Sequence, residues 1–123
     1  MNREDYVKRI HKVRETFMHE IQKDAIVAAG GDVEGAQEHL ARLEPKFVQL
    51  KKLQHDEERL FPALKGLIHK AIVLEDKLGE LVAQFVKEHD APRQQQLVTL
   101  ILKALDELER AAQEVDAKEL AQK

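Results

Sequence analysis

The chain has 123 residues, of which 43% are hydrophobic and 35% are charged, and its formal net charge is -3. This composition supports a single domain with an aliphatic core and excludes a disordered chain. The absence of cysteine excludes disulfides and thiolate metal sites, and the interspersed charges disfavour a nucleic-acid-binding surface. No apolar run approaches the roughly 20 residues of a membrane span, and the first residues, from Met1 to Tyr6, show no apolar core of a signal peptide. We therefore expect a soluble, cytoplasmic protein that contacts no membrane.

Apolar residues recur at steps of three and four near the N-terminus, which predicts a first helix over residues 3–29. Asn2 is expected to cap its start. The glycine pair at 30–31 is expected to end it, because glycine adopts the left-handed conformation of a helix stop.

A second helix is predicted over residues 33–62, with Asp32 as its N-cap. Pro45 lies inside the apolar stripe of this helix. The stripe keeps nearly the same angular phase on both sides of the proline. We therefore expect a kink at Pro45 and no new direction.

Two further helices are predicted over residues 67–89 and 92–120, with Asp90 capping the last one. The apolar stripe after Gly66 is rotated by roughly 110° from the stripe before Pro62, at about 100° per residue. This phase break argues against the alternative, a spectrin-like three-helix arrangement in which the second and third helices are fused. The prediction is an all-α fold, an antiparallel up-down-up-down four-helix bundle that occupies residues 1–123.

Six histidines raise the hypothesis of a metal site, because imidazole is a common metal ligand. A site in the core of a bundle needs ligands on the inward faces of several helices. On helical wheels two histidines face water (His19, His69), three lie at the edges of apolar stripes (His11, His39, His55) and one points inward (His89). The fourth predicted helix has no histidine. No shared layer of histidines is therefore predicted.

The second predicted helix carries a polar anomaly at its C-terminal end. Gln54 and Glu58 are four residues apart and continue the inward stripe, and Glu57 flanks them. A buried carboxylate costs several kcal/mol unless it is paired, protonated or bound to a metal. The two interpretations are a solvated helix end and a polar or metal-binding pocket.

The segment from His55 to Leu64, with its Asp-Glu-Glu and Leu-Phe-Pro strings, resembles the hemerythrin-like (HHE) family of four-helix bundles. The resemblance implies a di-iron centre, for which Glu57 or Glu58 would match the bridging glutamate and His11 the first-helix ligand. The histidine that should precede the glutamate is replaced by Leu53 or Gln54, and His55 is out of phase. The implied iron site would therefore be degenerate.

A second resemblance rests on Gly31-Asp32-Val33-Glu34 and on the segment 72–78. Both look like parts of the small flagellar export chaperones of the FliT type. Such chaperones are helical bundles that bind partner proteins through a groove, so this resemblance implies a protein partner.

We predict a non-catalytic protein, without a cofactor, that binds a partner protein or self-associates as a homo-oligomer. Binding would use exposed apolar edges by helix-in-groove packing. The candidate residues for this surface are Val7, Met18, Ala25, Leu100 and Leu102. The alternatives are a metal-binding protein with the degenerate site (His11, Gln54, His55, Glu57, Glu58) and a designed or purely structural bundle.

Overall fold

The computed structural model describes residues 3–121, and all regular structure in this range is helical. The all-α prediction is confirmed, but there are five α-helices instead of four. They are α1 (Arg3–Ala29), α2 (Val33–Ala41), α3 (Glu44–Leu60), α4 (Lys65–Lys87) and α5 (Ala91–Ala121), with a 3-10 helix η1 (Pro62–Leu64) between α3 and α4. Across this range, no helix has the length and apolarity needed to cross a membrane.

Local sequence signals set the helix ends. Gly31 has a φ of 114°, and α1 ends two residues before it. The Asp32 side chain accepts a hydrogen bond from the Gly35 backbone N–H at 3.2 Å at the start of α2. Asp90 accepts one from the Arg93 N–H at 3.1 Å at the start of α5. These predicted ends are confirmed, whereas the predicted cap at Asn2 lies outside the described residues.

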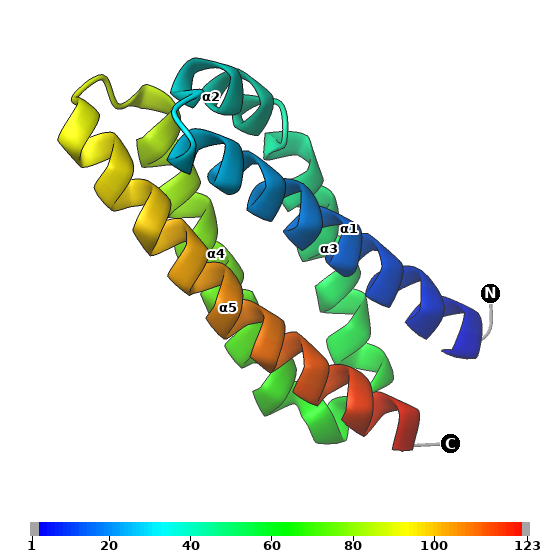
Figure 1. Ribbon diagram of the computed structural model, residues 1–123. Coiled ribbons are helices and arrows are strands. Elements are labelled where there is room, and N and C mark those ends of the chain that lie inside the picture. Colours follow the sequence, from blue (N-terminus) through cyan, green and yellow to red (C-terminus); the bar gives the residue numbers. More distant parts are fainter. Residues whose placement is uncertain (1–2, 122–123) are drawn as a thin grey trace.

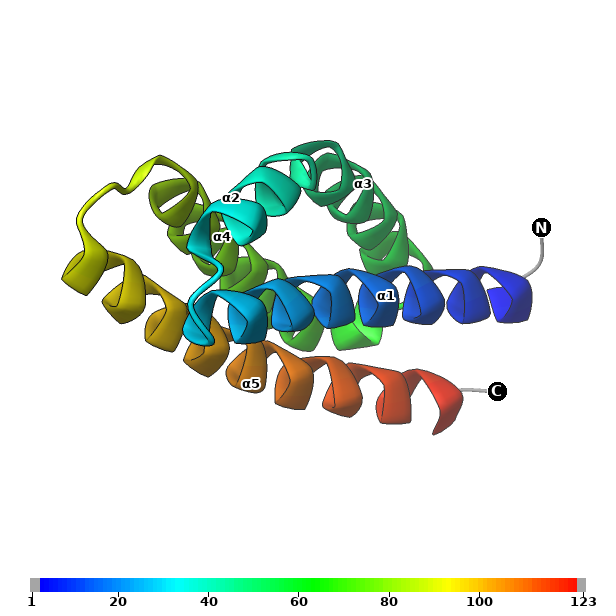
Figure 2. The same cartoon turned by 45° about the horizontal axis from the view of Figure 1, so that its top comes forward.

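The prediction of one kinked helix over residues 33–62 is wrong. The chain forms α2 and α3, and Pro45 lies in the first turn of α3. A proline in the first turn lacks an N–H that would be unpaired in any case, so it favours a new helix start. The two helices run in different directions (Figure 2).

The chain also breaks between α3 and α4, as the rotated stripe predicts. Phe61 has a non-helical backbone, with φ at -128° and ψ at 66°, and η1 then leads into α4. The second and third predicted helices are therefore not fused. The third helix begins at Lys65 and ends at Lys87, two residues earlier at each end than predicted.

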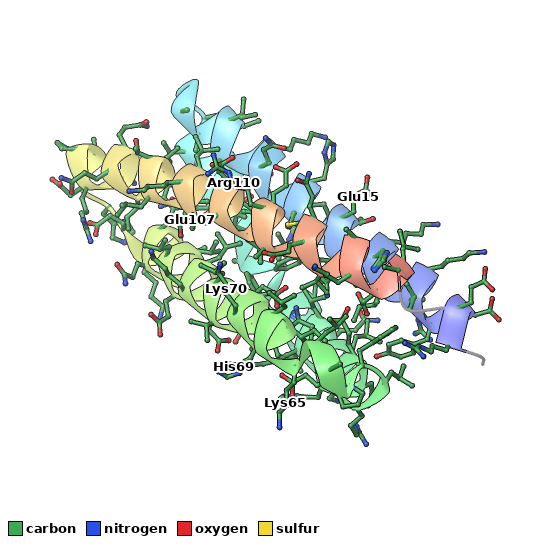
Figure 3. The ribbon with its side chains drawn as sticks, turned by 90° about the horizontal axis from the view of Figure 1, so that it is seen from below. Glu15, Lys65, His69, Lys70, Glu107 and Arg110 are labelled. Carbon is green, nitrogen blue, oxygen red and sulfur yellow. The ribbon has the colours of Figure 1, made fainter. Side chains whose placement is uncertain are left out.

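The helices are arranged as a ring around the core. Helix α1 packs against α2 and α3, these two pack against α4, α4 packs against α5, and α5 returns to α1. The start of α1 and the end of α5 lie at the same end of the molecule (Figure 1). The outer faces of α4 and α5 carry charged side chains such as Lys65, Lys70 and Arg110 (Figure 3).

The apolar core consists of two clusters. The larger contains Phe17, Leu50 and Leu108, and the smaller contains Phe61 and Val115. Between them along α1 and α3 lie the buried polar side chains of Arg14, Gln54 and Glu57, and buried Glu119 of α5 lies one turn beyond Val115. A polar layer thus separates two apolar parts of the same interior.

Candidate functional site

The buried polar layer is built by all four long helices. On each of them a polar or charged residue occupies a position of the inward stripe, at three- or four-residue spacing from buried apolar neighbours. We call these side chains the polar cluster: His11 and Arg14 of α1, Gln54 and Glu57 of α3, Glu75 of α4, and Asp116 and Glu119 of α5.

Arg14 lies at the centre of the polar cluster and is 1% exposed. Its Nη2 donates to Glu57 Oε1 at 2.7 Å, and its Nη1 donates to Asp116 Oδ1 at 2.9 Å. The planar guanidinium fork suits two such charge-assisted bonds. Arg14 therefore joins α1 to α3 and α5 inside the core.

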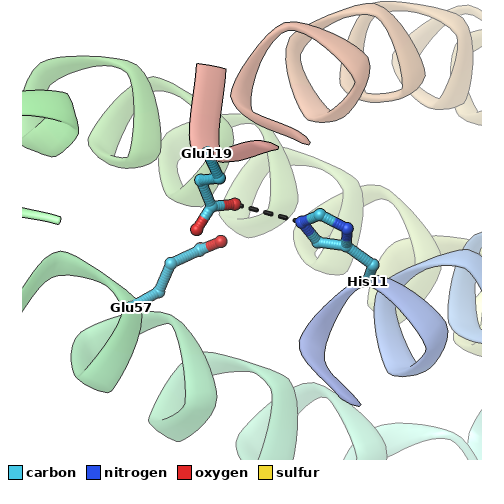
Figure 4. A group of neighbouring side chains, drawn as sticks. All are labelled: His11, Glu57 and Glu119. Atoms are coloured by element: carbon cyan, nitrogen blue, oxygen red, sulfur yellow. Dashed lines mark hydrogen bonds and ion pairs between the residues drawn. The ribbon is translucent and has the colours of Figure 1, made fainter. Parts of the chain in front are cut away.

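His11 lies one turn before Arg14 and faces α5. Its Nε2 is 3.1 Å from Glu119 Oε1 and 2.9 Å from Asp116 Oδ1 (Figure 4 shows the contact with Glu119). Burial lowers the pKa of His11, but the hydrogen bonds to Asp116 and Glu119 outweigh it and raise the pKa to about 9. With Asp116 and Glu119 nearby, the ring is cationic at neutral pH in the absence of another cation.

The carboxyl groups of Glu57 and Glu119 are neighbours (Figure 4). Each uses one oxygen, Glu57 for Arg14 and Glu119 for His11. The second oxygen of each carboxyl is buried and has no hydrogen-bond partner within residues 3–121. Burial raises the pKa of Glu57 to about 8 against the lowering effect of Arg14, and Glu119 adds to the rise. A cation or a proton would satisfy these two buried oxygens.

Gln54 and Glu75 form the part of the polar cluster that lies toward α4. Gln54 Nε2 donates to Glu75 Oε1 at 2.5 Å. Burial raises the pKa of Glu75 to about 7, although Arg14 and the hydrogen bond from Gln54 lower it.

The structure brings together three of the five residues predicted for the metal alternative: His11, Gln54 and Glu57. Glu58 is only half-buried and His55 is exposed, so the prediction that Glu58 points inward is wrong. The inward stripe of α3 runs through Leu50, Gln54 and Glu57, because Glu57 continues it at a three-residue step and buried Phe61 follows four residues later.

The other histidines stay apart from the polar cluster. His19 and His69 are exposed, as predicted. His89 is exposed, so its predicted inward position is wrong, because α4 ends at Lys87 and the helical wheel does not extend to residue 89. His39 is exposed and contacts Asp24 at 2.5 Å.

Sequence reasoning missed Arg14, Glu75, Asp116 and Glu119. Arg14 follows Ile10 by four residues and precedes Phe17 by three, so it continues an apolar stripe. Glu119 follows Val115 by four residues in the same way. A charged residue at a stripe position was the signal that could have found them.

The predicted partner-binding residues do not form one surface. Val7 and Ala25 are buried in the core, so they lack the exposure that this role requires. Met18 and Leu102 are partly buried and line the same small hollow between α1 and α5. Leu100 is 41% exposed.

A groove with a volume of about 700 Å³ lies between α3 and α4. Glu75 of the polar cluster also lines this groove. Its apolar lining includes Phe47, Val48 and Ala83, and its acidic residues are Glu44, Glu75, Asp76 and Glu80. Gly79 on α4 faces the Phe47 ring, and a Cβ there would lie 3.4 Å from it.

The chemistry of the polar cluster fits a divalent metal ion. One ligand atom from each of His11, Glu57 and Glu119 lies within 4.8 Å of the other two. Imidazole with carboxylates is a donor set for Zn²⁺, Mn²⁺ or Fe²⁺. In a tetrahedral zinc site with bonds of roughly 2.0–2.1 Å, ligand atoms lie roughly 3.4 Å apart. His11 Nε2 and Glu119 Oε1 already lie at 3.1 Å.

Comparison with protein-family models, with curated proteins and with solved structures found no match to this chain. The resemblances to the hemerythrin-like and FliT-type families therefore stay predictions.

Proposed function

We propose that this protein binds a divalent metal ion in its interior, held by His11, Glu57 and Glu119. The observation that carries the proposal is the pair of buried carboxylate oxygens, Glu57 Oε2 and Glu119 Oε2, that have no hydrogen-bond partner within the described chain. Buried polar atoms are almost always satisfied, so each exception calls for an ordered water, a ligand, an ion or a proton.

The proposal takes the helices to act as an antiparallel four-helix bundle in which α2 and α3 together fill one helix position. Ligands then come from α1, α3 and α5, in the manner of sites formed by facing helices in a bundle core. Asp116 lies on the solvent side of the cluster, with 33% of its side chain exposed, and would be the first carboxylate that an entering cation meets.

A calorimetric titration tests this proposal. Metal-free protein titrated with Zn²⁺ or Mn²⁺ at neutral pH is expected to bind one ion per chain. His11→Gln and Glu119→Gln are each expected to weaken binding by about tenfold or more, since loss of even a supporting group costs about 10–100-fold. Bound metal should also raise the melting temperature, because it binds the folded state alone.

The matched controls are His69→Gln on α4 and Glu109→Gln on α5, both exposed and away from the cluster. They are expected to bind like the unmodified chain. Absence of binding, or equal weakening in controls and cluster variants, would contradict the proposal.

A second candidate function is binding of a partner protein, and the groove between α3 and α4 favours it. Val48 is 54% exposed at the groove. Lys51 pairs with Asp76 at 2.8 Å, while Glu44 and Glu80 form no ion pair within residues 3–121. An amphipathic helix with basic flanks is therefore the partner that complements this surface.

This second candidate can be tested with a synthetic helix of leucine and lysine, titrated into the ¹⁵N-labelled chain and followed by NMR. The amide chemical shifts of Val48, Gly79 and Ala83 are expected to change on binding, and Ala83→Arg should abolish these changes. Gln84→Arg, on the neighbouring exposed position, should not. A basic helical partner would be contradicted if a helix with glutamate in place of lysine caused equal chemical-shift changes, or if the changes lay outside the groove. Self-association of the chain, or no chemical-shift change at all, would also count against it.

A further inference from the structure

Asp116 of the polar cluster faces two cationic groups, and Glu57 faces one. Asp116 Oδ1 lies 2.9 Å from His11 Nε2 and 2.9 Å from Arg14 Nη1. Glu57 gives one oxygen to Arg14, and its carboxyl group neighbours that of Glu119. The cluster thus has two neighbouring cation positions, one beside His11 and Glu119 and the other filled by the Arg14 guanidinium.

Burial and hydrogen bonds to two carboxylates hold the Arg14 guanidinium at that second position. Arg14 is 1% exposed and spans Glu57 and Asp116 with its two terminal nitrogens. An arginine side chain stays protonated throughout the accessible pH range. It is therefore a permanent positive charge at a point where two carboxylates converge.

The charges around His11 and Arg14, leaving Glu75 aside, indicate how many divalent ions these side chains can neutralise. With His11 neutral as a ligand, the carboxylates of Glu57, Asp116 and Glu119 face one guanidinium. Their net charge is minus two, which a single divalent ion cancels. Without Arg14 the same three carboxylates would carry a net charge of minus three, which one divalent ion does not cancel.

We propose that Arg14 is a built-in cation that limits the interior site to one divalent ion by occupying the second position between Glu57 and Asp116. The inference rests on the proposed metal-binding function. Arg14 acts here as a positioning and charge-setting residue, not as a ligand. It also holds the Glu57 carboxyl in place before the metal arrives.

The test is metal stoichiometry, measured by equilibrium dialysis with Mn²⁺ and elemental analysis of the whole chain. The unmodified protein is expected to bind one ion at saturation. Arg14→Met, which keeps the apolar stem and removes the charge, is expected to bind a second ion, since one charge fewer repels the metal. Arg14→Lys, which keeps the charge, is expected to bind one ion.

The possible outcomes separate the two proposals. If the unmodified chain binds no ion, the metal function itself fails. If it binds one ion and Arg14→Met also binds only one, the role of Arg14 is wrong and the metal function stands. Should Arg14→Met fail to fold, Arg14→Gln replaces it, and two ions in the unmodified chain would by itself overturn the role of Arg14.

Discussion

Glu75 is a buried carboxyl group whose direct hydrogen-bond donor is an amide, not a cation. Gln54 donates to it, Arg14 and Lys51 act on it from a distance, and Asp76 opposes them. Because burial dominates, its pKa rises to about 7. The folded state therefore favours the protonated form of Glu75 more than the unfolded chain does.

This shift predicts how stability depends on pH. A raised pKa in the folded state contributes stability that is fully present below the unfolded value of 4.5 and is lost as pH rises through about 7. The loss is on the order of 3 kcal/mol at one pKa unit per 1.36 kcal/mol. Metal-free Glu75→Gln should show a flatter fall of the free energy of unfolding between pH 4.5 and pH 7 than the unmodified chain.

Urea unfolding at several pH values measures this difference. Glu80→Gln, an exposed change five residues further along α4, is the control and should keep the original pH profile. An identical slope in Glu75→Gln and the unmodified chain would show that Glu75 ionises in the folded protein as it does in the unfolded one.

At the scale of the element, local signals explain the helix ends well. Gly31 and the aspartates at positions 32 and 90 act on their own turns, so the sequence is sufficient to predict them. The break at Pro45 was harder to predict, because the apolar phase on both sides matched a continuous helix. Nothing local distinguishes a kinked helix from two helices that separate to pack against different neighbours.

Two glycines offer a matched prediction on helix ends. Gly31→Ala should lower the free energy of unfolding by about 1–2 kcal/mol, because φ at 114° is strained for a residue with a Cβ. Gly66→Ala lies in α4 with open space around the added Cβ, and should raise it by about 0.4–1 kcal/mol. Chemical unfolding of both variants gives the two signs, and a loss of equal size in both would contradict this explanation of the turn.

At the scale of the whole molecule, the polar cluster divides the core into two apolar clusters. Burying an ion pair costs desolvation that its attraction only partly returns, so Arg14 with Glu57 is a weak source of stability. Its value lies in fixing how α1, α3 and α5 meet. Sequence could identify Glu57 and His11 as candidates, but not that Glu119 lies beside them, since this depends on the rotation of three helices about their axes.

The fold and the site differ in how far local sequence patterns determine them. Stripe spacing was sufficient to predict an all-α chain, because each helix shows its own period. The site required knowing which stripe residues face one another across the core. Arg14 and Glu119 are far apart in sequence. Only the packing of α1 against α5 brings Arg14 beside Asp116 and Glu119 beside His11.

The most direct test of an interior metal site is the position of the ion itself. Crystals of the whole chain grown with Mn²⁺ or Zn²⁺ and measured at the absorption edge of the metal should show one anomalous peak among His11 Nε2, Glu57 and Glu119. A peak found only on the surface, for example beside exposed His69, or no peak at saturating metal, would contradict the central claim that this interior binds a cation.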